Sequence, residues 1–145
     1  MTSSVFPDVN VWLALSSPDH QHSPRAWSWY TELPDDAVLY FCRFTQLGLL
    51  RLLTTQAVMG PGTLSQAEAW AAVDRWMEEG GAAFALESPA IERPFRCRTP
   101  AEQASPKDWA DAYLAAFAES AQFTLVTFDK ALAKKSENTV LLGQA

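Results

Sequence analysis

Short apolar runs alternate with helix-like segments along this chain, and no other feature constrains the fold as strongly. The runs are apolar throughout instead of alternating polar and apolar residues, which is the pattern of strands covered on both faces. They are the residues leading to Asp8, Ala37–Phe41, Ala82–Leu86, Phe123–Thr127 and Thr139–Leu142. We therefore predict an α/β fold, a three-layer α/β/α sandwich with a short five-stranded parallel sheet.

Helix-start signals separate these runs. A serine at the first position of such a signal can cap the helix, and proline is favoured directly after it. We expect helices after Ser23-Pro24, over Phe44–Thr54, after Ser65-Gln66-Ala67-Glu68, and after Ser105-Pro106-Lys107-Asp108, the last including Asp111–Ala118. Between the third and fourth helices, the segment Ser88–Pro100 is expected to hold only a short helical turn.

Length and composition predict one domain over residues 1–145, because 145 residues with 48% apolar content supply enough material for one core. The N-terminus lacks the basic start and apolar centre of a signal peptide, and no apolar run reaches the roughly 20 residues that span a bilayer. We therefore expect a cytoplasmic protein.

Cys42 and Cys97 have no metal-ligand spacing, and buried thiols are the interpretation we favour, although a bridge between them stays open.

Three carboxylates fall at or near the ends of predicted elements. Asp8 follows the first strand and Asp129 follows the strand Phe123–Thr127, while Asp111 lies in the helix before that strand. Ligands of open parallel sheets bind beyond the carboxyl ends of the strands. If the two strands are neighbours, these acids meet at one edge of the sheet.

Carboxylates that lie close together repel one another and raise one another's pKa unless a cation lies between them. Oxygen ligands without His or Cys suit Mg²⁺ or Mn²⁺ better than zinc. Such an ion can polarise a phosphodiester and lower the pKa of water. The net charge of −6 argues against nucleic-acid binding by bulk electrostatics, but it is compatible with an acidic metal site.

Each acid also has a structural explanation. Asp8 can cap the helix that starts at Val9, Asp129 can be a turn residue, and Asp111 can simply face solvent. We interpret Asp108 as the first-turn partner of Ser105, with metal ligation as the alternative. His20 and His22 lie in a polar turn without a third metal-ligating partner and are interpreted as loop residues.

Basic residues gather in two places that can contact a nucleic acid. Arg93, Arg96 and Arg98 surround Phe95, and Lys130, Lys134 and Lys135 follow Asp129. Such a loop can contact phosphates and stack on an unpaired base, or it can simply be solvated. Two further arginines, Arg43 and Arg51, flank the central helix, and we expect one of them to pair with an acid or line the cleft.

The helices carry more large apolar residues than a small core hides easily. Trp12, Trp27, Trp70 and Trp76 are the clearest cases. We expect an apolar face for a partner subunit or a partner helix.

Four motifs occur in a familiar order and spacing across nearly the whole chain. They are VFPDVNVWLAL (5–15), FTQLGLLRLLT (44–54), DAYLAAFA (111–118) and LVTFDKAL (125–132). Together they resemble the PIN-domain ribonucleases, and most closely the VapC toxins of bacterial toxin–antitoxin pairs. The resemblance implies a PIN-like fold, Mg²⁺- or Mn²⁺-dependent cleavage of structured RNA, a cognate VapB-like antitoxin and frequent homodimers.

The resemblance also implies roles for individual residues. Asp8, Asp111 and Asp129 become the catalytic, metal-binding carboxylates, and Asn10 and Thr127 become supporting residues that orient them or a bound water. Many PIN domains have a Glu in the central helix, where this chain reads Thr45-Gln46. Gln46 can hydrogen-bond a water, or Asp108 can compensate, so the number of metals stays open.

Two other functions remain compatible with the sequence. Gln46 favours a degenerate PIN domain that binds RNA or a protein without cutting it. A phosphatase of the haloacid-dehalogenase type also places an Asp after the first strand, but it requires a second Asp two residues on, where this chain has Asn10.

Overall fold

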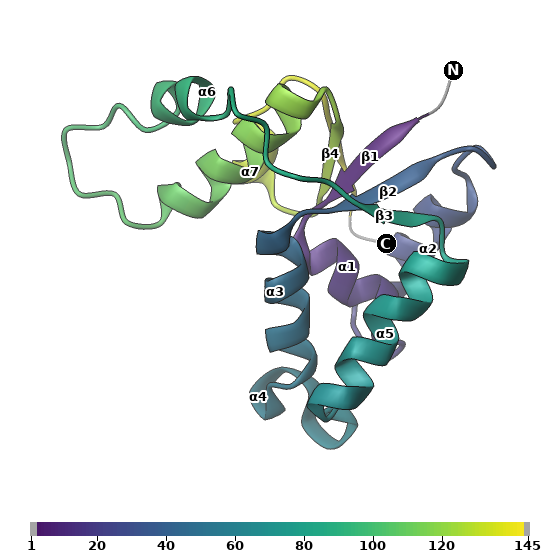
Figure 1. Ribbon diagram of the computed structural model, residues 1–145. Coiled ribbons are helices and arrows are strands. Elements are labelled where there is room, and N and C mark those ends of the chain that lie inside the picture. Colours follow the sequence, from purple (N-terminus) through teal and green to yellow (C-terminus); the bar gives the residue numbers. More distant parts are fainter. Residues whose placement is uncertain (1–2, 144–145) are drawn as a thin grey trace.

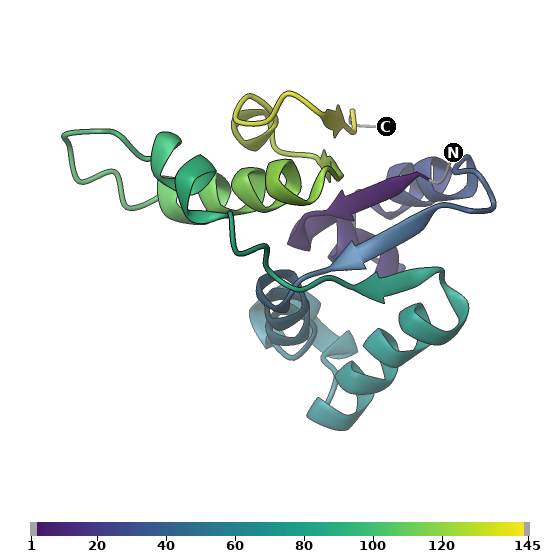
Figure 2. The same cartoon turned by 45° about the horizontal axis from the view of Figure 1, so that its top comes forward.

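The computed structural model describes residues 3–143 and contains a sheet of five parallel strands in the order β3-β2-β1-β4-β5. The strands are β1 (Ser4–Pro7), β2 (Val38–Phe41), β3 (Ala82–Phe84), β4 (Thr124–Thr127) and β5 (Thr139–Leu141). Figure 2 shows this order as a colour series, with purple β1 between blue β2 and green β4. All five predicted strands are present, each within one or two residues of its expected position.

Helices connect the strands and cover the sheet (Figure 1). They are α1 (Val9–Ser16), α2 (Ser23–Thr31), α3 (Arg43–Leu53), α4 (Gln56–Met59), α5 (Gln66–Glu79), α6 (Glu92–Cys97), α7 (Asp108–Ala121) and α8 (Lys130–Ala133), with a short 3₁₀ turn, η1 (Gly60–Gly62). The predicted turn within Ser88–Pro100 is α6. In both ribbon views the loop between α6 and α7 extends away from the sheet.

Successive strand residues supply two separate cores, one on each face of the sheet. On the first face Trp12 of α1 stacks on Phe41 at 3.9 Å between ring centroids, and helices α1, α2, α3 and α5 contribute to this core. On the second face Phe6 stacks on Phe117 of α7 at 5.0 Å. Successive side chains of a strand point to opposite faces of the sheet, and each face is covered by different helices. The expected α/β/α sandwich is therefore confirmed.

The predictions of serine caps were right for one helix and wrong for two. Ser65 Oγ accepts from the Glu68 N–H at 3.1 Å, and the Glu68 carboxylate accepts from the Ser65 N–H at 2.9 Å, which is the predicted capping box. Ser23 is not a cap, because the preceding turn, in which the His22 N–H donates to His20 Nδ1, lets the helix begin one residue earlier. Ser105 is not a cap either, since its carbonyl accepts from the Asp108 N–H in a turn before α7.

The burial of large and reactive side chains departs from the sequence prediction in places. Cys42 is buried, as predicted, but Cys97 is exposed because it ends the short surface helix α6. Among the tryptophans, Trp12 and Trp76 are buried, whereas Trp27 and Trp70 are exposed. No helix among residues 3–143 combines the length and apolar character needed to cross a membrane.

Candidate functional site

The candidate site lies where the order of strands in the sheet reverses. β1 pairs with β2 on one side and with β4 on the other. The chain therefore leaves the end of β1 toward one side of the sheet and the end of β4 toward the other. The Asp8 N–H extends the pairing by donating to the Val126 carbonyl at 2.9 Å. The sequence analysis expected Asp8 and Asp129 to meet if the strands before them were neighbours. These two strands are neighbours, and they end at the same edge of the sheet.

Asp8 is buried and fixed by two hydrogen bonds. Its side chain is the N-cap of α1, where Oδ1 accepts from the Val11 N–H at 3.1 Å, and Oδ2 accepts from the Thr127 hydroxyl. The residue is only 5% exposed, and this burial is the main reason why the pKa of Asp8 rises from 3.8 to about 6. The charge of Asp129 raises that pKa further, while the two hydrogen bonds oppose the rise.

Thr127 joins the two acidic strand ends. Its buried hydroxyl donates to Asp8 and accepts from the Asp129 N–H at 2.9 Å. Asp129 is exposed and caps α8, since its Oδ1 accepts from the N–H groups of Ala131 at 2.8 Å and Leu132 at 3.3 Å. One hydroxyl therefore sets the position of two acidic residues from opposite ends of the chain, and Thr127 itself is 119 residues from Asp8.

Asp111 lies in the first turn of α7 and is half-buried. Burial raises its pKa most, and the charges of Asp129 and Asp108 raise it further, while Lys135 lowers it. Asp108 forms an ion pair with Lys135 at 3.9 Å between Oδ1 and Nζ. The charge of Asp129 thus acts on both Asp8 and Asp111, so the three carboxylates share one electrostatic environment.

The three carboxylates do not form a closed cage in this conformation. Within residues 3–143, no three His, Cys, Asp or Glu side chains are close enough to hold a metal ion. The donor set is nevertheless all oxygen, and burial, together with the negative charge of Asp129, raises the pKa values of Asp8 and Asp111. A hard divalent cation that uses waters for its remaining ligands fits this chemistry better than zinc does.

The proposed supporting residues lie in different surroundings. Asn10 is exposed in the first turn of α1, next to Val9 at the edge of a surface groove. Gln46 is half-buried, and its side-chain oxygen accepts from the Arg43 guanidinium. Gln46 is therefore held by a cation on its own helix in the observed arrangement, and Thr127 is the supporting residue that directly contacts a carboxylate.

The cations that are predicted to contact RNA differ in whether their charged groups already bond to the protein. Arg93 and Lys130 are exposed, and Arg96 is exposed in an ion pair with Glu92 at 3.1 Å. Arg98 instead donates to the carbonyls of Lys135 and Pro94 and to the carboxylate of Glu119. These bonds occupy its guanidinium and tie α6 to α7 and to the loop after α8.

The sequence placed Lys135 among the basic residues after Asp129 but did not predict its acidic partner, and it assigned no role to Trp109 and Tyr113. Lys135 follows Asp129 by six residues, and the short helix α8 returns it to Asp108. Trp109 and Tyr113 are exposed and half-buried, respectively, and lie two residues before and after Asp111. Their spacing of four residues places them on one face of a helix, and this signal was available in the sequence.

Comparisons with known proteins agree with the fold and the motifs. The PIN domain family matches residues 5–138. The chain is 39% identical over 128 residues to Ribonuclease VapC41 of Mycobacterium tuberculosis, which covers 86% of this chain and 88% of that protein. It is 32% identical over 130 residues to Ribonuclease VapC44 of the same organism, covering 87% and 86%.

A solved structure gives the same picture of the fold. The crystal structure of Mycobacterium tuberculosis VapC20, described as a Sarcin-Ricin loop cleaving toxin, has a TM-score of 0.64 at 12% identity and covers 90% of this chain and 93% of its own. At that identity the likeness speaks for the fold alone. The family match and the two ribonuclease relatives go further: the chain belongs to the PIN-domain family and, within it, to the VapC group.

Proposed function

We propose that this protein is a metal-dependent endoribonuclease that hydrolyses phosphodiester bonds of structured RNA, and that it acts as the toxin of a VapBC-type pair. The observation that carries the proposal is the meeting of Asp8 and Asp129 at neighbouring strand ends, joined through Thr127. The 39% identity to a protein named as a ribonuclease supports the reaction class.

Asp8, Asp111 and Asp129 are the residues that would hold Mg²⁺ or Mn²⁺. A divalent cation supplies Lewis-acid polarisation of a phosphodiester and a lower pKa for water. Asp8 contributes a carboxylate whose direction is fixed by Val11 and Thr127. Asp129 and Asp111 contribute more accessible carboxylates, and the negative charge of Asp129 acts on both of the others.

Four cations are proposed to contact RNA phosphates, namely Arg43, Arg93, Arg96 and Lys130. All four are exposed. We leave Arg98 out of this set because its guanidinium is already bonded to three groups of the protein. Asp108 is assigned a positioning role, since it holds Lys135 beside the acids.

The test is cleavage of a pool of structured RNAs during a titration with Mn²⁺ or Mg²⁺. Asp8→Asn and Asp129→Asn should each abolish cleavage and growth inhibition while the protein stays folded. Full activity in either variant would remove the basis of the assignment. A chelator should stop the wild-type reaction, and added Mn²⁺ should restore it.

A degenerate PIN domain that binds RNA or a protein without cutting it is the second candidate. It is favoured by Gln46 and by the lack, within residues 3–143, of three metal-ligating side chains close enough to enclose an ion. In the same experiment such a protein would retain RNA without shortening it at any Mn²⁺ concentration.

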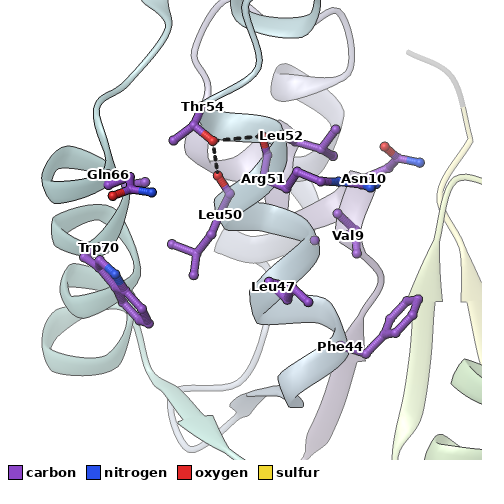
Figure 3. A pocket seen from close by; sticks show the side chains of 12 residues that line it. Val9, Asn10, Phe44, Leu47, Leu50, Arg51, Leu52, Thr54, Gln66 and Trp70 are labelled. Carbon is purple, nitrogen blue, oxygen red and sulfur yellow. Dashed lines mark hydrogen bonds between the residues drawn. The ribbon is translucent and has the colours of Figure 1, made fainter.

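We further propose that the groove between α3 and α5 binds the antitoxin. This groove, of about 770 Å³, is lined by apolar side chains that include Leu47, Leu50 and Trp70, of which Leu47 is 62% exposed. Figure 3 shows Trp70 from α5 and Leu50 from α3 directed into the space between the two helices. Leu47→Lys should weaken capture of the co-expressed antitoxin, because it places a charge on an apolar contact surface.

A homodimer is also proposed, with RNA and the antitoxin as the other partners. Sedimentation of the isolated protein over a range of concentrations tests this directly. A single species of monomer mass at all concentrations would contradict the dimer without affecting the assignment of the acidic site.

A further inference from the structure

A second surface hollow, which shares Phe44 and Leu47 with the α3–α5 groove, is lined mainly by aromatic rings. This aromatic cleft has a volume of about 540 Å³ and lies between α3, α6 and α7. Its lining includes Phe44, Phe95, Trp109 and Tyr113, together with Arg43. In the described part of the chain Arg43 is the one charged residue of this lining.

The aromatic rings pack edge-to-face, and this packing fixes the orientation of the side chains that form the walls of the cleft. Phe95 lies edge-on to both Trp109, at 6.2 Å and 74°, and Tyr113, at 5.8 Å and 83°. The Tyr113 hydroxyl donates to Glu87 at 2.7 Å, which fixes that ring from its outer end. Trp109 remains 54% exposed and Phe44 41% exposed, so aromatic surface is open to a ligand.

Helix α7 contributes side chains to both the cleft and the acidic site. Trp109 and Tyr113 precede and follow Asp111 by two residues, and their spacing of four places the two rings together on the face of α7 that is turned away from Asp111. RNA that reaches both the rings and Asp111 therefore has to pass around this helix.

Arg43 gives the cleft a positive charge without an acidic counterpart. Its guanidinium lies over the Phe84 ring at 4.6 Å and donates to the neutral side chain of Gln46. Among residues 3–143, the ion pairs involve other cations. A protein segment that is purely apolar would leave this charge unused, whereas an aromatic base attached to a phosphate complements both the rings and the guanidinium.

We infer that the aromatic cleft binds an unpaired nucleobase of RNA, stacked against Trp109 and Tyr113, with the attached phosphate contacted by Arg43. The inference rests on the proposed function, because it assumes that RNA is the substrate, and it deepens that function by assigning a base-binding subsite. Stacking of this kind tolerates any base, since every base has a π-face. The subsite therefore selects single-stranded or looped positions over paired ones.

The test compares two ligands with the same number of phosphates, fluorescently labelled hexaadenylate and an abasic hexamer, by anisotropy in EDTA. The wild type should prefer hexaadenylate. Trp109→Leu should weaken hexaadenylate binding by about 5- to 150-fold and change abasic binding by no more than about twofold, because only base stacking is removed. Trp109→Tyr, which keeps a ring, should restore most of the loss.

Trp27→Leu is the matched control, because Trp27 is also exposed but lies on α2, where its ring stacks on Trp76. It should bind both hexamers as the wild type does. Equal binding of the two hexamers by the wild type, or equal loss in the Trp109 and Trp27 variants, would overturn the subsite. So would a Trp109 variant that binds normally but fails to bind the antitoxin, which would make the cleft a protein interface.

The outcome is separable from the test of the proposed function. Binding is measured without metal and without cleavage, whereas the nuclease assignment depends on Asp8 and Asp129. Loss of base preference in Trp109→Leu together with an inactive wild type would retain the subsite and reject the nuclease. Mn²⁺-dependent cleavage by a protein with no base preference would retain the nuclease and reject the subsite.

Discussion

Replacing Asp8 by Asn should make the metal-free protein more stable while abolishing its proposed activity. The wild-type carboxylate is 5% exposed, and burial together with the charge of Asp129 raises its pKa from 3.8 to about 6. Ionised Asp8 therefore destabilises the folded state. Asn has the same shape and can still accept from the Val11 N–H, so it removes the charge; its amide would donate to the Thr127 hydroxyl, whose own hydrogen then loses its acceptor, and this offsets part of the gain.

The pKa of Asp8 sets the upper limit of the effect. A rise of about two pKa units corresponds to about 3 kcal/mol in the free energy of unfolding, or roughly 10 °C in Tm for a chain of this size. Because the folded state binds the proton more tightly, wild-type stability falls as the pH rises from about 4 to about 6. The advantage of Asp8→Asn should be complete above pH 6 and absent below pH 4.

Urea unfolding in EDTA at pH 8.0, 6.0 and 4.0 measures this difference, with Asp74→Asn on the exposed side of α5 as the control. The control should stay within about 0.5 kcal/mol of the wild type at each pH. Added Mn²⁺ should raise the Tm of the wild type and leave that of Asp8→Asn unchanged. A destabilised Asp8→Asn at pH 8.0 would refute the argument that an ionised, buried carboxylate opposes folding here.

Four further outcomes are expected. Thr127→Val removes a hydroxyl that donates to Asp8 and accepts from the Asp129 N–H, so urea unfolding should show a loss of about 1–3 kcal/mol. Gly48→Ala places a Cβ 2.7 Å from Val9 Cγ2, where α3 meets α1, and should lower the free energy of unfolding by about 1–3 kcal/mol. Phe117→Ala removes the ring stacked on Phe6 and should cost about 3–5 kcal/mol, measured by thermal unfolding. RNA binding should weaken less between 50 and 200 mM salt than the roughly 1,000-fold or greater loss of a basic protein with many phosphate contacts, since the net charge is −6; a steep slope would contradict this.

The sheet could be predicted because its strands are short and apolar, a pattern that depends only on burial on both faces. Val5, Leu39 and Val126 all lie in the first core, while Phe6 and Leu125 lie in the second, as expected from alternating side-chain directions. The pairing of β1 with β4 is different. It joins segments over 100 residues apart, and no local pattern specifies that neighbour.

Helix starts were predictable only where the signal was complete within the local sequence. Ser65 and Glu68 satisfy each other's backbone and side-chain groups, so no distant contact is needed. At Ser23 and Ser105 the preceding turn changes the first helical residue. Such turns depend on hydrogen bonds from neighbouring residues, which single capping statistics do not contain.

For the candidate site, the sequence predicted the positions of the acids but not their surroundings. Asp8 acts both as a helix cap and as a buried acid, so the two interpretations that seemed to compete describe the same side chain. Arg98 looked like part of a solvent-facing cluster, yet its partners Glu119 and Lys135 come from later in the chain. Long-range partners of this kind decide whether a cation is free, and they become visible only in the folded structure.

Two of the three site acids are oriented by the start of a helix. Asp8 uses one oxygen to cap α1, and Asp129 uses one oxygen to cap α8. Each side chain therefore loses its rotational freedom when the helix forms, before any ion arrives. A ligand that binds there would meet two carboxylates whose ordering entropy was already lost during folding, because the helix caps and Thr127 hold them in place.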